Sequence, residues 1–193
     1  SIFGYKAIVI STMLIAFIGY FVWGHHMFTA GMSNTALFAF SFLTFLVAIP
    51  SAIKVFNWIA TLYRGSINLR TPFYWGVSFI FVFMIGGLSG LVLGSLATNV
   101  HVHDTAFVVA HFHFIVFGGV GFAFMGAIHY WFPKIFGRMY DAKWANTGWL
   151  TFFIGFLTLY TPMFVLGIMG MPRRYFDYLP EFHGMNILSS FGA

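Results

Sequence analysis

Long apolar runs dominate this sequence, and few folds can accommodate them. A helix needs roughly 20 apolar residues to cross a bilayer, whereas barrel strands would be shorter and would alternate in polarity. Composition agrees, since 60% of the 193 residues are hydrophobic, 7% are charged and the mean hydropathy is +0.89. We therefore predict an all-α, polytopic transmembrane helix bundle, a single membrane domain over residues 1–193, with about five full spans and the start of a sixth. The runs cover Lys6–Phe28, Thr35–Tyr63, Pro72–Thr98, Thr105–Phe132 and Trp144–Met169, and the sixth begins near His183.

The basic residues predict how these spans are oriented. If every run crosses once, six basic residues fall on one side of the membrane and two on the other, and by the positive-inside rule the larger group faces the cytoplasm or the matrix. The segments GHHMFTAGM, VHVHDTAFVVAHFHF and GMPRRYFDY then all lie toward the outer face, where their polar side chains can surround a common site. The inner group is Lys6, Arg64, Arg70, Lys134, Arg138 and Lys143, and the outer group is Arg173 and Arg174.

Cysteine usage and charge exclude several classes of function. The chain has no cysteine, so disulfides and thiolate metal sites are excluded, and any metal must be held by histidine and oxygen ligands. The formal net charge is +5, but the nine basic residues are scattered between apolar runs and form no patch. We therefore predict no nucleic-acid partner.

The stretch VHVHDTAFVVAHFHF holds four of the eight histidines of the chain. His111 and His113 are two residues apart, so on a helix their side chains point about 200° from each other, roughly 10 Å below the outer end of the span. A lone histidine at that depth is often satisfied by a backbone carbonyl or a neighbouring helix, and this alternative stays open. The pair favours ligation of haem iron, because imidazole binds it axially and the surrounding apolar residues can enclose a macrocycle. We assign no role to His101 beyond that of an interfacial histidine.

A second histidine pair lies at the outer end of the first run. His25 and His26 are adjacent, about 100° apart on a helix, and they can converge on one ion if the last turn opens slightly. Imidazole ligation in a cysteine-free chain indicates Cu, Zn or Fe rather than Ca or Mg. The alternative is an ordinary interfacial pair.

Two charged groups flank the same outer face. Asp104 is either the cap of the following helix, with Thr105 in its first turn, or part of a hard-cation site together with His103. Arg173 and Arg174 are either interfacial anchors or bidentate partners for haem propionates.

Lys54 is an ionisable residue deep within the second run. It lies roughly 14 Å from the inner end of that helix, where an ammonium group marks a candidate functional site. Ser51, Thr44 and Thr61 share its helix face, and a lysine with a shifted pKa can pass protons along such hydroxyls. Snorkelling is the alternative, although the stem would have to cover more than its own length.

Four segments carry a resemblance to a known family. VWGHHMFTAGM, AIPSAIKVFNW, HVHDTAFVVAHFHF and GMPRRYFDY, in this order and spacing, closely resemble the second half of subunit I of haem-copper oxygen reductases of the cytochrome c oxidase type. The resemblance covers essentially the whole chain and implies helices seven to the start of twelve of that subunit. It implies a part of the catalytic subunit of a terminal respiratory oxidase, which reduces dioxygen to water and pumps protons.

The resemblance also implies roles for the histidines. His25 and His26 would be two of the three histidine ligands of the copper ion called copper B. His111 would bind the iron of a high-spin haem facing that copper. His113 would bind the iron of a low-spin haem, with Phe112 between the two haems. Both haems are expected to be of the a type.

The remaining polar residues receive roles from the same resemblance. His103 and Asp104 would contribute to a magnesium or manganese site at the border with subunit II. Arg173 and Arg174 would pair with haem propionates. Lys54, helped by Ser51, would carry protons that come from the inner side of the membrane, along the so-called K pathway of the family.

The chain departs from the family pattern in two ways, which bear on the kind of organism it comes from and on which parts of the active centre it contains. Ala106 and Phe107 stand where mitochondrial members commonly have two tyrosines, and Gly24 stands where alanine is frequent. Both features look bacterial, so a bacterial cytoplasmic membrane is favoured over the mitochondrial inner membrane. The family's third copper ligand, the tyrosine linked to it, the other axial ligand of the low-spin haem and the acidic residue of a second proton pathway would lie before Ser1.

The expected partners are oxidase subunits II and III, the remainder of subunit I, the lipid bilayer, and cytochrome c or quinol as electron donor. Two other functions stay open. A nitric-oxide reductase of the same superfamily would share the histidines but would not be expected to have the Lys54 pathway. A transporter or structural bundle with interfacial histidines is the non-enzymatic alternative.

Overall fold

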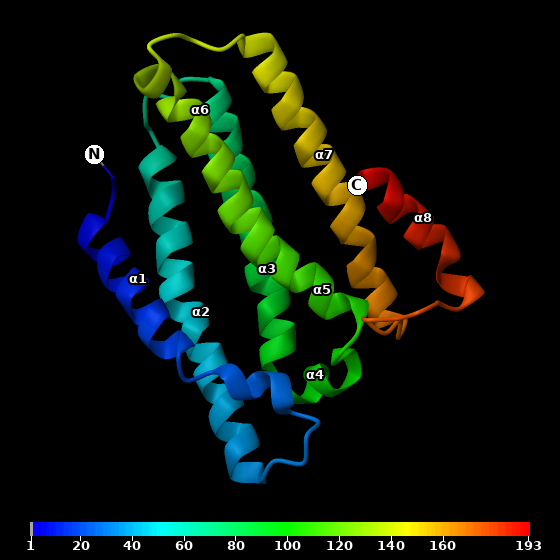
Figure 1. The fold of residues 1–193 in the computed structure, drawn as a ribbon. Coiled ribbons are helices and arrows are strands. Elements are labelled where there is room, and N and C mark those ends of the chain that lie inside the picture. The colour runs from blue at the N-terminus through cyan, green and yellow to red at the C-terminus, as the bar shows by residue number, and fades with distance from the viewer. Residues whose placement is uncertain (1) are drawn as a thin grey trace. The chain divides into compact units, whose positions relative to one another are not determined.

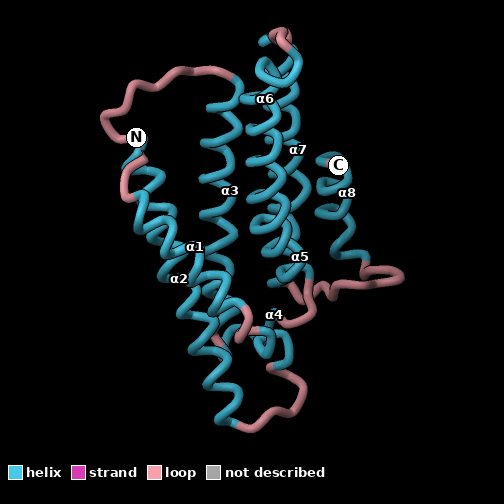
Figure 2. Tube along the Cα trace, turned by 60° about the vertical axis from the view of Figure 1, so that its left-hand side comes forward, coloured by secondary structure: helices cyan, strands magenta, loops and turns pink. Residues whose placement is uncertain are grey.

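The computed structural model shown in Figure 1 describes residues 2–193 of the chain. These residues form helices joined by loops (Figure 2), with one isolated bridge between Thr105 and Pro172. The predicted all-α fold is therefore confirmed. The α-helices are α1 Tyr5–Gly19, α2 Asn34–Leu62, α3 Thr71–Gly94, α4 Leu96–Val102, α5 Ala106–Phe112, α6 Phe122–Phe136, α7 Ala142–Ile168 and α8 His183–Gly192. Two 3-10 helices cover Trp23–Met27 and Pro180–Phe182, and a π-helix covers His113–Gly121.

Four helical stretches in the described residues are long and apolar enough to cross a membrane. Three are α2, α3 and α7, and the fourth is the continuous stretch Ala106–Phe136, which joins α5, the π-helix and α6. Polar side chains cap the start of three of them. The Ser33 hydroxyl accepts from the Ala36 N–H at 3.3 Å, the Thr105 hydroxyl from the Phe107 N–H at 3.3 Å, and the Asp141 carboxylate from the Lys143 N–H at 2.8 Å. Length and composition thus support the expected transmembrane bundle, with four stretches of spanning length in the described residues instead of about five, because the helix of the first run, Tyr5–Gly19, is shorter.

Two of the expected runs divide differently in the structure. The first run is an α-helix over only 15 residues, because α1 ends at Gly19 and the chain continues into the 3-10 helix that carries His25 and His26. Gly19 and Gly24 both lower helix propensity here. The third run ends its helix at Gly94, and α4 starts anew after Ser95, which has an extended backbone.

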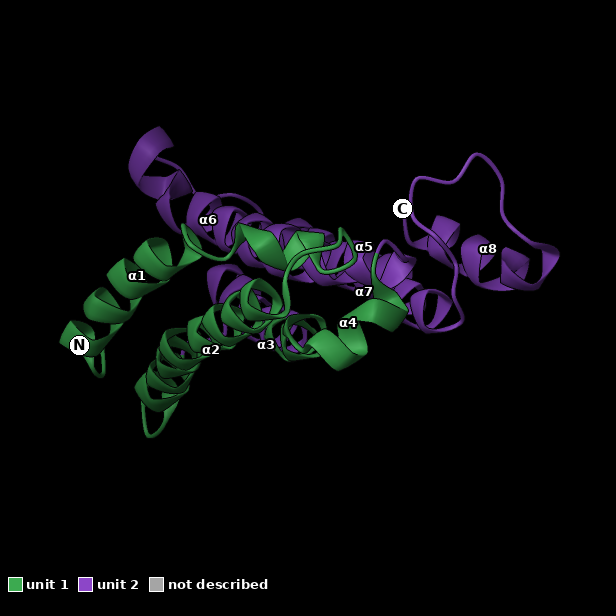
Figure 3. Cartoon of the chain, turned by 90° about the horizontal axis from the view of Figure 1, so that it is seen from below, with its two compact units in different colours: residues 1–67, 87–103 green, residues 68–86, 104–193 purple. Residues whose placement is uncertain are grey.

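The chain packs as two compact units, drawn in different colours in Figure 3. The first unit comprises the residues up to Ile67 together with Gly87–His103. In it α1 packs along α2, and the Ser41 hydroxyl of α2 donates to the Gly94 carbonyl at 2.7 Å. The second unit comprises Asn68–Gly86 and Asp104–Ala193.

An aromatic core holds the second unit together. Its buried residues come from α3, from the π-helix, from α6 and from α7, and ring pairs such as Phe114 and Phe156, 5.1 Å apart and edge-on, add to their burial. Near the other end of α7, Gly167 lies against the Phe107 backbone so closely that a side chain there would overlap it. This glycine therefore lets α5 approach α7. The core residues are Trp75, Val82, Phe114, Phe122 and Phe156.

Candidate functional site

His25 and His26 lie side by side in the first unit. The 3-10 helix brings their Nε2 atoms to 3.0 Å from each other. The Thr44 hydroxyl of α2 donates to the Phe40 carbonyl at 2.6 Å, so its oxygen is left to accept from His25 Nδ1 at 3.1 Å. That contact assigns the His25 proton to Nδ1 and places the ring's lone pair on Nε2, the atom directed at His26.

These two imidazoles alone do not make a complete metal site. Across residues 2–193, no group of three or more His, Cys, Asp and Glu side chains comes together. An ion held here would need further ligands besides His25 and His26.

His111 lies in the second unit, in the last turn of α5. Its Nδ1 contacts the Gly86 carbonyl of α3 at 3.0 Å. A Cβ added at Gly86 would lie 2.9 Å from Ile115 Cδ1 and 3.0 Å from Phe114, so the missing side chain allows this approach of α3. Because a carbonyl oxygen only accepts, Nδ1 carries the proton and Nε2 carries the lone pair.

His113 begins the π-helix and has the same tautomer by a different route. Its Nδ1 donates to the Val109 carbonyl one turn back, at 2.9 Å. The ring stacks on Tyr160 of α7, with centroids 4.2 Å apart and planes 18° apart, and the Phe112 ring lies 4.4 Å away. His111 and His113 thus face two different helices, α3 and α7, in agreement with the side-chain directions that their spacing predicts.

The π-helix itself was not predicted. It spans nine residues directly after Phe112, and π-helical segments inside α-helices are frequent at functional sites. Its sequence, HFIVFGGVG, has the apolar pattern of an ordinary spanning helix. The one sequence feature that indicates close packing in this segment is the pair Gly118 and Gly119. The missing side chain of Gly118 allows its close contact with Val82 and Phe156.

Asp104 does not cap α5, contrary to the capping alternative considered for it. Thr105 is the cap, and its hydroxyl accepts from the Phe107 N–H at 3.3 Å. Asp104 has a left-handed backbone with φ 53°, and its carboxylate pairs with the Arg173 guanidinium at 2.6 Å. The Arg173 N–H also donates to the Asp104 carbonyl at 2.9 Å, so side chain and backbone fix the two loops together.

The two adjacent arginines are not equivalent. Arg173 is 21% exposed and its Nε is buried without a hydrogen-bond partner, while Arg174 is exposed and has φ 58°. His103, at the end of α4, donates its N–H to the Asn99 carbonyl at 2.7 Å. His101 is exposed.

Lys54 and Ser51 lie on α2 with Thr44. The Lys54 ammonium lies over the Trp58 ring, 5.3 Å from its centroid. Ser51 donates to the Val47 carbonyl at 2.9 Å, as Thr44 does to Phe40, so each hydroxyl is bonded within its own helix. The sequence pointed to the Thr44 stripe, but not to the contact of Thr44 with His25, nor to Tyr160 beside His113.

Comparison with known proteins places this chain in a family. The family model described as cytochrome c and quinol oxidase polypeptide I matches residues 1–193. Cytochrome c oxidase subunit 1 of Bacillus sp. (strain PS3) is 45% identical over 100% of this chain and 32% of its own length. The corresponding protein of Synechocystis sp. is 44% identical over 100% of this chain and 35% of its own length.

A solved structure, described as a heme-copper terminal oxidase dimer, matches 89% of this chain and 36% of its own chain with a TM-score of 0.79 and 29% sequence identity. The chain spans about a third of the length of the curated relatives it matches. The resemblance carried by the four sequence segments is confirmed, and the chain belongs to the family of cytochrome c and quinol oxidase polypeptide I.

Proposed function

We propose that this chain forms part of the catalytic subunit of a terminal respiratory oxidase that reduces dioxygen to water and couples the reaction to proton pumping. The observation that carries the proposal is the shared tautomer of His111 and His113, whose Nδ1 atoms contact the carbonyls of Gly86 and Val109. Histidines that bind metals typically donate the other ring nitrogen to such an acceptor. Two such imidazoles on one helix, facing different neighbours, suit two haem irons.

The residues around these histidines fit two haems. We propose His111 as the ligand of a high-spin haem and His113 as the ligand of a low-spin haem, with Phe112 between them and both haems of the a type. The carbonyls orient the rings, and Tyr160 holds the His113 plane by stacking. When bound, the haems and a copper ion supply electron transfer and oxygen reduction.

The geometry of His25 and His26 fits a copper ion. Imidazole nitrogen binds ions of this size at about 2.0 Å, so two nitrogens that lie 3.0 Å apart can contact the same ion. We propose both as ligands of copper B. Thr44 then acts as the positioning residue that keeps His25 Nε2 unprotonated.

The same helix connects this pair to a candidate proton donor. Thr44, Ser51 and Lys54 share one face of α2, and Lys54 is about 15 Å from Thr44 by the helical rise. The hydroxyls of Thr44 and Ser51 donate to carbonyls of their own helix, so bound water or rotation of these hydroxyls must complete a proton path. We propose that Lys54 and Ser51 pass protons along α2 toward His25 and His26.

The outer-face residues complete the proposal. The buried Arg173 Nε has no partner among the described residues, which suits an anionic group such as a haem propionate, and we propose the same role for Arg174. We propose His103 and Asp104 as ligands of a magnesium or manganese ion. Because Asp104 pairs with Arg173, a cation there would share this carboxylate with the guanidinium.

The proposed setting follows from the same family membership. We propose that the chain works in a membrane, favouring a bacterial cytoplasmic membrane, together with the remainder of subunit I and with subunits II and III. The electron donor would be cytochrome c or quinol. The similarity to bacterial relatives supports this assignment.

A pair of histidine variants tests the proposal in the purified complex that contains this chain. His113→Ala is expected to remove the low-spin haem, about half of the total, in the reduced-minus-oxidised absorption spectrum. His129→Ala is the matched control, because His129 Nδ1 also donates to a carbonyl one turn back, that of Met125 at 2.7 Å, but it is not a proposed ligand. Equal haem loss in both variants would contradict the assignment.

A second measurement separates an oxidase from a nitric-oxide reductase: the rates at which the unaltered complex consumes dioxygen and nitric oxide are compared.

A further inference from the structure

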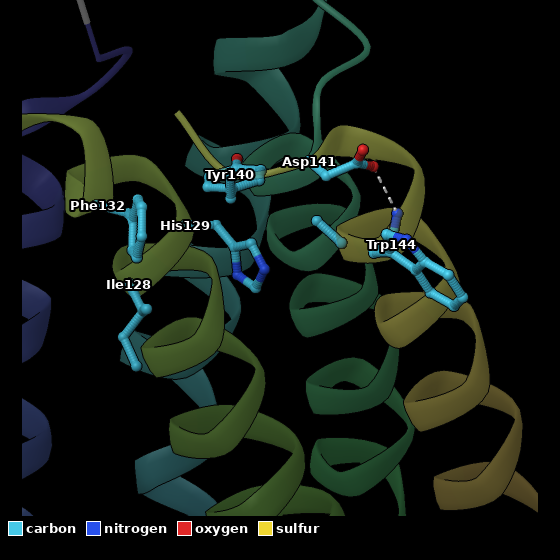
Figure 4. Close-up of a pocket in the computed structure, with 7 residues that line it drawn as sticks. Ile128, His129, Phe132, Tyr140, Asp141 and Trp144 are labelled. Atoms are coloured by element: carbon cyan, nitrogen blue, oxygen red, sulfur yellow. Dashed lines mark hydrogen bonds between the residues drawn. The ribbon is translucent and has the colours of Figure 1, made fainter. Parts of the chain in front are cut away.

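A pocket of about 410 Å³ lies at the ends of α6 and α7 that are joined by the loop 137–141, within the second unit. Figure 4 shows its walls, with the His129 ring between the two helices and Trp144 across from it. The lining is mostly apolar and aromatic, from Ile128, Phe132, Trp144 and Ala145, with Tyr140 closing the loop side. None of these residues belongs to the sites proposed above.

The polar wall of the pocket is held in place from several sides. His129 Nδ1 donates to the Met125 carbonyl at 2.7 Å, and its ring stacks on Trp75 at 5.8 Å. The Tyr140 ring meets it edge-on at 5.1 Å. Because Trp75 is only 1% exposed and belongs to the aromatic core, this wall is part of the rigid unit.

The charges around the pocket favour an anion. Residues 128–145 contain three basic side chains, Lys134, Arg138 and Lys143, and one acidic side chain, Asp141. The Asp141 carboxylate is engaged at the start of α7, where it accepts from the N–H groups of Lys143 at 2.8 Å and Trp144 at 3.1 Å. The charged side chain that lines the pocket is this Asp141, while Arg138 and Lys143 do not line it but lie within two residues of the lining residues Tyr140 and Trp144, so this end of the two helices carries a net positive charge.

The remaining surface shows which anion fits. Trp144 is 74% exposed and Ile128 is 39% exposed, on helices long and apolar enough to cross a membrane. A tryptophan at the end of a spanning helix is typical of the headgroup level, and basic residues there attract anionic lipids. A free phosphate would leave the apolar walls exposed, whereas a lipid covers them with an acyl chain.

We propose that this pocket binds an anionic phospholipid. Its phosphate lies at Arg138 and Lys143, and the first part of one acyl chain lies against Ile128, Phe132 and Trp144. The bound lipid fills the space between α6 and α7 and so supports the inner end of the second unit.

Trp144 provides the reporter for the test. The complex that contains this chain is stripped of lipid in detergent and supplied with brominated phosphatidylglycerol or brominated phosphatidylcholine, and tryptophan quenching is measured. The part of the quenching that Trp144→Phe abolishes reports on the pocket. We expect this part to be saturable with phosphatidylglycerol and to need about fivefold more lipid for each charge removed in Arg138→Gln and Lys143→Gln.

Two further variants keep the proposal falsifiable. Lys134→Gln is the matched charge control, because Lys134 lies within α6, outside the loop 137–141 and the first turn of α7, and its ammonium lies over the Tyr130 ring at 5.1 Å, so its quenching curve should not move. Ala145→Phe fills the pocket without changing the charge and should abolish the Trp144 signal while haem absorption, the check on folding, is retained. Equal quenching by phosphatidylcholine, or an equal shift in all three charge variants, would overturn the proposal.

Discussion

At the scale of single residues, oxygen acceptors decide which ring nitrogen carries the lone pair in three of the candidate histidines, His25, His111 and His113. Gly86 and Val109 offer carbonyls to His111 and His113, and Thr44 offers a hydroxyl oxygen to His25. The Thr44 oxygen can only accept in this contact because its own proton is donated to Phe40. A hydrogen bond within one helix thereby sets the tautomer of a neutral imidazole on a neighbouring segment.

Lys54 gives the first prediction at this scale. Lys54→Met keeps the length and the packing against Trp58 but removes the ammonium, so proton supply along α2 should fail while ligand geometry is kept. In rapid-mixing measurements on the purified complex, reduction of the high-spin haem should slow roughly a hundredfold, with unchanged haem content. Lys6→Met, at an exposed lysine of α1, is the control and should leave the rate unaltered. Unchanged kinetics in Lys54→Met would rule out a proton role.

At the scale of elements, the stretch Ala106–Phe136 shows where sequence reasoning succeeds and where it stops. Its apolar character predicts a spanning helix, and the spacing of His111 and His113 predicts rings on different sides. The π-helix could not be predicted, because a shift to hydrogen bonds five residues apart leaves the hydrophobic pattern almost unchanged. The pairing of Asp104 with Arg173 was also missed, since it joins loops 69 positions apart in the chain.

Two adjacent glycines of α3 provide an element-scale prediction. A Cβ at Gly86 would lie 3.0 Å or less from atoms of Phe114 and Ile115, whereas among the described residues a Cβ at Gly87 meets nothing within 4 Å. Gly86→Ala should therefore push α3 away from the π-helix and move the Gly86 carbonyl from His111. We expect a loss of about 1–3 kcal/mol in stability and a perturbed high-spin haem spectrum.

Gly87→Ala is the matched control for this prediction. It makes the same chemical change one residue later and should be neutral or up to about 1 kcal/mol stabilising, because alanine has the higher helix propensity. Thermal unfolding of the complex, followed by haem absorption, measures both effects. Similar melting temperatures and spectra in the two variants would show that close packing at Gly86 does not hold His111.

At the scale of the whole molecule, apolar runs and basic residues carry most of what could be predicted. The runs predicted the helices, but not the end of α1 at Gly19, because hydropathy continues past it to Phe28 while the backbone does not stay α-helical. The candidate metal ligands were named from the sequence, whereas the Thr44 hydroxyl beside His25 and the Gly86 carbonyl beside His111 depend on packing between segments distant in the chain. Local pattern therefore predicts elements, and their contacts require the tertiary structure.

The predicted orientation of the chain in its membrane can be tested by cysteine labelling, because this sequence contains no cysteine of its own. Six of eight basic residues at span ends fall on one side under the predicted topology, so the loop between α6 and α7 should face the cytoplasm and the segment after α7 the outside. Met139 and Phe176 report on these two sides, being 62% and 104% exposed. With a membrane-impermeant maleimide, intact spheroplasts should label this chain in Phe176→Cys and not in Met139→Cys, and inverted vesicles should give the reverse. Labelling of both variants from one side would contradict a single crossing by α7. A reversed labelling pattern would contradict the predicted orientation, in which the candidate copper and haem ligands lie toward the outer face.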